Sequence, residues 1–278
     1  MALLCISLLI PIYWLLATSL KDGQLAYLEN LFGFPWPMRF ANYKNMWKAI
    51  FVQGVESNGR VYYYWLDSLL MHSLIYSFIT PAWNLFLTIC CAYTLSKYKF
   101  KGRGFIYNLG IFVFLLPLNT YFPALMLIYR SLRVYNNAFL YILTNPSAAF
   151  SGVVFLAFYA AFKAMPWTYA EAVFMDGGGH FTVFFRIMLP LITPVFVAWY
   201  IIQFLSAWNE VNVFLTWLPG FPNLGVGMMY FQTISWQYGA TYPMIMAGMM
   251  LVMLPAIILF MLTQKFTFAK MNVGGLKE

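Results

Sequence analysis

The chain has 278 residues, of which 63% are hydrophobic and 9% are charged, whereas about a quarter of the residues in a soluble domain are charged. This composition excludes an ordinary soluble globular enzyme. Apolar blocks longer than the roughly 18 residues that suggest a membrane helix recur along the chain, so the lipid bilayer is its expected solvent. The net charge of +8 is attributed to membrane topology and not to a nucleic-acid partner.

Six apolar blocks predict an all-α polytopic membrane protein with six transmembrane helices. The first block, residues 1–20, has neither a basic leader before it nor an A-x-A cleavage site after it, so we interpret it as a first span and not as a signal peptide. A mixed polar and aromatic segment at 21–67 predicts an extracytoplasmic loop. The remaining blocks are expected at residues 68–96, 105–129, 138–162, 191–218 and 243–263.

The topology follows from the number of spans and the position of the basic residues. Residues 68–264 form one expected transmembrane domain of five spans, with a polar loop at 163–190, and residues 265–278 form a tail. Lys97, Lys99, Lys101 and Arg103 form a basic cluster at the end of a span, where positive charge favours the cytoplasmic side. Both termini and the 163–190 loop are therefore expected in the cytoplasm.

Cysteines and histidines indicate no disulfide framework and no metal centre. Cys90 and Cys91 are adjacent within one apolar block and Cys5 lies in another, which is not the spacing of metal ligands. His72 and His180 are the only histidines and are far apart in the sequence. We expect no metal and no cofactor in this chain.

The 163–190 loop contains a short helical segment with pronounced end signals. Pro166 precedes it, Thr168 and Glu171 have the spacing of a capping box, and three glycines that begin at Gly177 are expected to stop the helix. The predicted helix has about two and a half turns. A short helix presented between two spans suits a groove on a partner protein.

The same loop resembles the signature of type I ABC importer permeases, which reads E-A-A, three residues, G, nine residues, I, one residue, L-P. The matching residues in register are Glu171, Ala172, Gly177, Ile187, Leu189 and Pro190, with Asp176 directly before the glycine. Val173 departs from the pattern, since the family usually has alanine there. The family also usually has an acidic residue where Thr168 stands.

The resemblance extends over nearly the whole chain. Ser19-Leu20-Lys21 is similar to the end of the first span in carbohydrate-importer permeases, and Ala92-Tyr93-Thr94-Leu95 with Tyr98-Lys99-Phe100-Lys101-Gly102 is similar to their A-Y-A-L and R-F-x-F-x-G passage. Phe204 with Trp208-Asn209 resembles the F-x3-W-N of the fifth span. The closing Gly274-Gly275-Leu276-Lys277 resembles the tail of the second permease in maltose-type pairs.

The resemblance implies a permease subunit of an ATP-driven importer in the cell membrane of a prokaryote. The expected solute is a carbohydrate, in particular an oligosaccharide, delivered by an extracytoplasmic binding protein. A second permease and an ATPase dimer are the implied partners, and ATP and Mg belong to the ATPase. This chain has no G-x-x-x-x-G-K-[ST] phosphate loop, so we expect a transport subunit and not an enzyme.

Two groups of residues are candidates for functional roles. Thr168, Glu171, Ala172, Asp176, Gly177, Ile187, Leu189 and Pro190 are expected to couple the permease to the ATPase, although Glu171 could instead only complete the capping box. A substrate path is suggested by Asn119, Tyr121, Trp208, Asn209 and Glu210. Glu210 is the only carboxylate inside an apolar block, on one helical face with Gln203 and Ser206. Packing or subunit contact is the alternative for Trp208, Asn209 and Glu210, and a simple kink is the alternative for Asn119 and Tyr121.

Other functions remain possible at this point. An importer permease for a non-sugar solute would carry the same loop. A channel would repeat pore-lining polar residues along a helix, and an integral-membrane enzyme would cluster polar catalytic groups at one depth. The register match from Glu171 to Pro190 argues against the channel and the enzyme.

Overall fold

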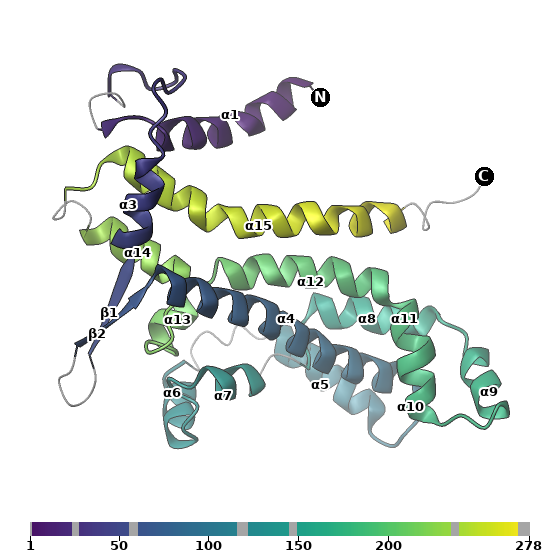
Figure 1. Ribbon diagram of the computed structural model, residues 1–278. Coiled ribbons are helices and arrows are strands. Elements are labelled where there is room, and N and C mark those ends of the chain that lie inside the picture. The colour runs from purple at the N-terminus through teal and green to yellow at the C-terminus, as the bar shows by residue number, and fades with distance from the viewer. Residues whose placement is uncertain are drawn as a thin grey trace. The chain divides into compact units, whose positions relative to one another are not determined.

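The structure is a computed structural model that describes residues 2–23, 28–55, 61–115, 122–144, 149–234 and 239–271. The chain divides into two compact units, which are treated separately below. Unit 1 contains residues 1–75 and 208–261, and unit 2 contains residues 76–207 and 262–278. Figure 1 follows the elements in chain order.

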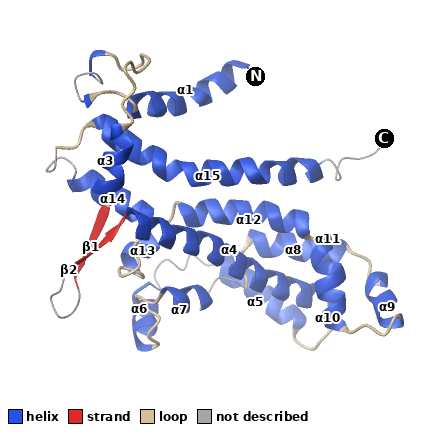
Figure 2. Ribbon diagram, in the orientation of Figure 1, coloured by secondary structure: helices blue, strands red, loops and turns tan. Residues whose placement is uncertain are grey.

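The described chain is mostly helical, with one pair of strands (Figure 2). The N-terminal elements are α1 (Ala2–Ser19), α3 (Ala41–Ala49), β1 (Phe51–Val55), β2 (Val61–Trp65) and α4 (Leu66–Lys97). The central elements are α5 (Arg103–Leu115), α6 (Phe122–Ser131), α7 (Ala138–Leu143), α8 (Val153–Ala164), α9 (Thr168–Met175), α10 (His180–Thr182) and the π-helix η2 (Val183–Met188). The C-terminal elements are α11 (Leu189–Leu191), α12 (Thr193–Trp208), α13 (Asn212–Thr216), α14 (Leu224–Ile234) and α15 (Tyr242–Met271).

The two strands correct the all-α expectation for the 21–67 loop. β1 and β2 pair antiparallel, with Phe51 opposite Trp65 and Gln53 opposite Tyr63. The β2 sequence is valine followed by three tyrosines and a tryptophan, residue types that favour strands because they pack well on a pleated surface. The sequence analysis described this segment as mixed polar and aromatic and did not predict the strand pair.

Helix length and composition identify some of the expected membrane spans. Leu66–Lys97 and Tyr242–Leu259 are each long and apolar enough to cross a bilayer. Two bent pairs also qualify when each is taken together: α8 with α9, at 63°, and His180–Leu191 with α12, at 70°. The described part of the chain therefore has two to four candidate spans, with shorter apolar helices at Leu9–Ser19 and Arg103–Leu115.

Several predicted blocks are divided into shorter helices. The 105–129 block contains the end of α5 and the beginning of α6, where Pro123 occupies the first turn, a position that proline tolerates. The 191–218 block breaks after Trp208 and resumes as α13. The segment between the predicted blocks 191–218 and 243–263 contains the helix α14, which the sequence analysis did not predict.

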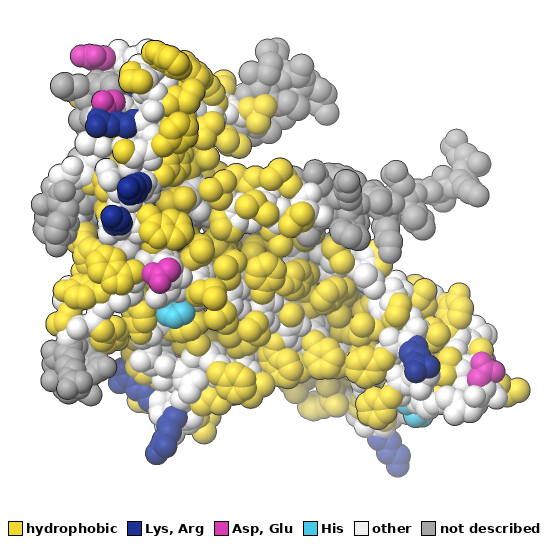
Figure 3. All heavy atoms as spheres, in the orientation of Figure 1, with side chains coloured by type: hydrophobic (Ala, Val, Ile, Leu, Met, Phe, Trp, Pro, Cys, Tyr) yellow, Lys and Arg dark blue, Asp and Glu magenta, His cyan; other side chains and the backbone are white. Residues whose placement is uncertain are grey.

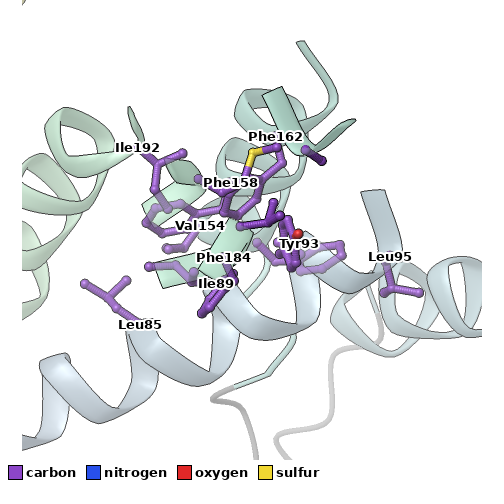
Figure 4. Packing of buried hydrophobic residues seen from close by; sticks show 14 residues of the cluster. Leu85, Ile89, Tyr93, Leu95, Val154, Phe158, Phe162, Phe184 and Ile192 are labelled. Carbon is purple, nitrogen blue, oxygen red and sulfur yellow. The ribbon is translucent and has the colours of Figure 1, made fainter. Parts of the chain in front are cut away.

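The core of unit 2 forms where α8 packs against α4. Phe155, Phe158 and Phe162 follow a helical spacing on α8 and are at most 1% exposed. Leu85 and Ile89 join the same core from α4, and Figure 4 shows Ile89, Phe158 and Phe162 in one cluster. Lipid tails are as apolar as these side chains, so the hydrophobic effect does not drive such an interface within a bilayer. Close van der Waals packing between the side chains stabilises it instead.

Unit 1 is held together around the strand pair and the first turns of α4. The Tyr64 hydroxyl donates to the Gly220 carbonyl oxygen at 2.7 Å, and His72 Nδ1 donates to the Pro222 carbonyl oxygen at 2.8 Å. The His72 ring also stacks on Phe221 at 3.7 Å between centroids. Ser73 Oγ accepts the backbone N–H of Leu224 at 2.7 Å, at the beginning of α14. These bonds fix the turn between α13 and α14.

A buried lysine organises the chain after α1. Lys21 is 4% exposed and donates to the backbone carbonyl oxygens of Asn30 and Leu31. Burial lowers the pKa of Lys21, because removal from water disfavours the charged form. The Asn42 amide donates to the carbonyl oxygens of Ser19 and Lys21, each at 2.9 Å. The beginning of the 21–67 loop is therefore tied to the end of α1.

Hydrophobic side chains cover most of the face shown in Figure 3, and charged side chains are few on it. Large exposed apolar residues include Phe105 and Phe112 on the short apolar helix α5 and Leu262 on α15. Soluble proteins rarely expose contiguous apolar surface on this scale. The surface fits a protein whose helices are solvated by lipid.

Candidate functional site

Helix α9 has a buried face and an exposed face. Ala170 is fully buried in the unit 2 core, and Val173 and Phe174 pack against the same core. The exposed face carries four residues at helical spacing: Thr168, Glu171, Ala172 and Met175. Figure 1 shows α9 outside the helices α4, α5 and α8, beyond α10. The helix thus presents one free face while the other fixes it to unit 2.

The predicted capping box at the beginning of α9 is wrong. The N-cap position is Trp167, whose backbone is in the α region and which makes no side-chain capping bond. Thr168 is therefore the first helical residue, and the cap is one position earlier than a Thr168–Glu171 box requires. The Trp167 ring contacts Tyr98 at 5.9 Å and Phe174 at 6.3 Å between centroids. Because the capping box does not form, Glu171 does not serve to complete one. The Glu171 side chain is exposed.

The end of α9 is a Schellman motif that depends on Gly177. The Gly178 N–H donates to the Val173 carbonyl oxygen at 2.8 Å, and the Gly177 N–H donates to the Phe174 carbonyl oxygen at 3.0 Å. Gly177 has φ of +77°, the left-handed conformation that this motif places after the helix. A Cβ at Gly177 would meet nothing within 4 Å. Conformation, and not obstruction by a side chain, is therefore the reason for glycine here.

The chain returns from α9 through a short π-helix. η2 contacts α9 and ends at Met188, which is fully buried. Ile187 and Leu189 are half-buried and Pro190 is exposed. Pro190 lacks the N–H that would continue a regular helix, and π-helical turns occur mostly as single inserted turns, frequently at functional sites. The Ile187 to Pro190 part of the signature therefore coincides with an irregular helix and with the 70° bend before α12.

The candidate substrate-path residues occupy different environments. Trp208 is 3% exposed and its Nε1 donates to the Val252 carbonyl oxygen at 3.1 Å. Asn209 is exposed and follows the last residue of α12. Glu210 lies in the break between α12 and α13, where its Oε1 accepts the Val213 N–H at 3.2 Å. Asn119 and Tyr121 lie outside the described residues.

The position of Glu210 corrects a predicted helical face. Gln203 and Ser206 are within α12, but that helix ends at Trp208, so Glu210 does not share a face with them. Its carboxylate instead accepts an N–H of the first turn of α13, where a negative charge is favourable. The Glu210 carbonyl oxygen accepts the Asn223 amide at 2.6 Å. Both contacts are local and hold the turn structure of unit 1.

Two exposed apolar residues on α9 were not among the predicted site residues. Met175 is 89% exposed and Tyr169 is 49% exposed. Met175 follows Glu171 by four residues, so the sequence contained the signal that they share a face. Methionine adapts its shape to a binding surface, which makes Met175 a suitable contact for a partner groove.

The arrangement offers a contact surface and not a set of reacting groups. Within the residues that the structure describes, no three His, Cys, Asp or Glu side chains gather as metal ligands. A helix with one face fixed and one face free is typical of recognition in a groove on another protein. The fold and this site together define a mostly helical protein with membrane-capable helices and a short helix that presents one free face.

Comparison with known proteins gives the family. A model of the family described as "Binding-protein-dependent transport system inner membrane component" matches residues 84–273. The chain belongs to this family, whose members are ABC permease transport subunits and not enzymes.

Individual relatives match over almost the full length. The arabinooligosaccharides transport system permease protein AraQ of Bacillus subtilis is 31% identical, over 97% of this chain and 90% of its own length. The sulfoquinovosyl glycerol transport system permease protein SmoH of Agrobacterium fabrum is 26% identical, over 99% and 91%. A chain from the crystal structure of a bacterial ABC transporter involved in alginate import has the same fold, with a TM-score of 0.75, 17% identity and coverage of 95% and 92%.

Proposed function

We propose that this chain is one of two membrane-spanning subunits of an ATP-driven carbohydrate importer. An extracytoplasmic binding protein delivers an oligosaccharide, and a separate ATPase dimer that binds ATP and Mg supplies the energy. The full-length match to permeases named for arabinooligosaccharides, diacetylchitobiose and galactooligosaccharides supports the substrate class. Membership of an inner membrane component family supports the location in the cell membrane.

Helix α9 is the proposed contact with the ATPase. The observation that carries this proposal is the division of α9 into a buried face and a free face with Glu171 and Met175. A force applied to the free face reaches the unit 2 core through Ala170, which has no exposed surface. Asp176 and Gly177 shape the end of α9, and Ile187, Leu189 and Pro190 shape the return to α12.

The proposed topology keeps six spans and two cytoplasmic termini. The six predicted blocks contain α1, α4, α5 with α6, α7 with α8, α12 with α13, and α15. The 163–190 loop and the 265–278 tail are placed in the cytoplasm and the 21–67 loop outside. The 13 residues of α5 and the 12 of α8 rise only about 20 Å at 1.5 Å per residue. Broken helices of this kind occur in membranes where they are buried in protein or line a cavity.

The substrate path is proposed to run near Asn119, Tyr121, Trp208, Asn209 and Glu210. Asn209 is the described member with an exposed side chain and Glu210 is half-buried, whereas the burial of Trp208 gives it a packing role in the free chain. Glu210 and Asn209 follow directly after the end of α12. Discontinuous helices line solute sites in other membrane transporters.

The test uses the assembled importer in proteoliposomes, with this chain, its second permease, the ATPase dimer and the binding protein. Uptake is measured with a labelled panel of arabino-, galacto- and chito-oligosaccharides, alongside ATP hydrolysis. Glu171→Lys should abolish uptake while the chain remains inserted, and Glu171→Gln should retain part of it. Unchanged uptake in Glu171→Lys would remove the coupling proposal, and uptake of only non-sugar solutes by the unaltered importer would remove the substrate class.

A further inference from the structure

The end of α4 contacts both sides of the α9 loop. Tyr98, one residue after α4 ends, packs edge-on against Trp167 before α9, with 5.9 Å between centroids. The same Tyr98 ring contacts His180 after α9 at 5.4 Å, and its hydroxyl is 3.0 Å from His180 Nδ1. The Phe174 ring on α9 closes the group at 5.0 Å from His180.

A second contact fixes the same end of α4. Lys97 Nζ donates to the carbonyl oxygen of Met165, which is the C-cap residue of α8. A cation at the end of a helix satisfies one of the free carbonyl groups and interacts favourably with the helix dipole. At the end of α4, Lys97 therefore contacts the chain before α9, and Tyr98 contacts the chain both before and after α9.

From these contacts we propose that Tyr98 and His180 are positioning residues that deliver the movement of α9 to α4. The inference rests on the proposed coupling function, and it adds a route that the signature residues do not contain. α4 has 32 residues with Pro81 inside it, so a displacement of the α9 loop at Tyr98 is applied to the last turns of α4, which belong to unit 2. Tyr98 and His180 contact each other through ring packing and one hydrogen bond. The Tyr98 hydroxyl also lies 3.5 Å from the Tyr93 hydroxyl on α4.

The hydrogen bond matters because packing does not fix this group on all sides. Tyr98 and His180 line a pocket of about 300 Å³ whose other walls are mainly aromatic. The remaining lining residues are Phe86, Cys90, Tyr93, Thr94, Phe181, Phe184 and Phe185. His180 is exposed, so the space beside it lets the ring turn away from Tyr98 when the bond is lost. The loop would then move without α4.

The experiment measures oligosaccharide imported per ATP hydrolysed by the complete importer, with the labelled panel described above. Tyr98→Phe removes the hydroxyl oxygen and keeps the ring, and His180→Phe keeps a ring but removes the nitrogen that forms the hydrogen bond. Each should lower the ratio by roughly twofold to tenfold, the effect of one neutral hydrogen bond on an equilibrium. The double variant should have a ratio no lower than that of the more impaired single variant, because both substitutions break the same Tyr98–His180 bond. His180→Asn, which retains a polar atom near Nδ1, should restore part of the ratio.

Tyr200→Phe is the matched control. Its hydroxyl donates to the Phe78 carbonyl oxygen at 3.1 Å, a bond between α12 and α4 that does not involve the α9 loop. The ratio should not change in this variant. An unchanged ratio in Tyr98→Phe, together with uncoupling in Glu171→Lys, would overturn the positioning role and leave the proposed function intact. An unchanged ratio in Glu171→Lys as well would overturn both the coupling function of α9 and the positioning role of Tyr98 and His180. Failure of His180→Phe to assemble would leave Tyr98→Phe as the deciding variant.

Discussion

The end of α9 allows a test with two glycines that differ in one property. Gly177 has φ of +77°, whereas Gly179 has φ of −99°, and a Cβ at either position would meet nothing within 4 Å. Alanine at Gly177 must adopt the left-handed conformation, which costs about 1–2 kcal/mol. Alanine at Gly179 fits its extended backbone and should stabilise by about 0.4–1 kcal/mol, because it restricts the unfolded chain.

The expected consequence is local opening of the last turn of α9. An eight-residue helix has little stability of its own, so a cost of about 1–2 kcal/mol raises its opening equilibrium roughly 5- to 30-fold. Hydrogen exchange of a peptide that contains residues 168–180 should accelerate by that factor in Gly177→Ala and should not accelerate in Gly179→Ala. Equal acceleration in both variants, or none in Gly177→Ala, would refute the assignment of the Schellman motif.

Three further predictions concern other parts of the chain. Ala170→Leu should destabilise unit 2 by about 1–3 kcal/mol because Ala170 is fully buried and a larger side chain must displace its neighbours. Ala172→Leu should leave thermal stability unchanged and weaken ATPase binding in a pull-down. Equal destabilisation by both variants would contradict the division of α9 into a buried and an exposed face. Glu210→Gln retains an acceptor for the Val213 N–H but removes the charge, so a capping role predicts a loss of stability of at most about 1 kcal/mol and unchanged uptake. A loss of uptake without a larger loss of stability would instead support a charged path residue. Tyr63 and Trp65 on β2 are both about half exposed. If the binding protein docks on the 21–67 loop, the double variant Tyr63→Ser with Trp65→Ser should reduce the stimulation of the ATPase by the loaded binding protein. Full stimulation would exclude this face of β2 as the docking site.

The α9 loop shows which features local sequence could predict. The glycines after Met175 specify a helix end, because a Schellman motif requires a left-handed residue that only glycine adopts without cost. The beginning of α9 could not be located in the same way. Thr168 is a good capping residue, but Trp167 takes the cap position while its ring packs against Tyr98 and Phe174. The contact between Trp167 and Tyr98 joins residues that are distant in the sequence, so a local pattern does not reveal it.

Glu210 shows the same limit at a break between helices. It lies in an apolar block, and nothing local stops α12 before it. The Trp208 indole donates to Val252 and the Asn223 amide donates to the Glu210 carbonyl oxygen, so the break is stabilised by partners 44 and 13 residues away. For β2, by contrast, the tyrosine-rich run was a usable signal for a strand.

The most direct test of the account is site-specific crosslinking from α9 in native membranes. Single cysteines replace Ala172 and Met175 on the exposed face, and Phe174 on the buried face serves as the control, in a chain whose native cysteines are changed to serine. Mass spectrometry then identifies the crosslinked partner. The account predicts a P-loop ATPase joined to Ala172→Cys and Met175→Cys and not to Phe174→Cys. Absence of an ATPase at both exposed positions, in a chain that is inserted and assembled with a second permease, would contradict it.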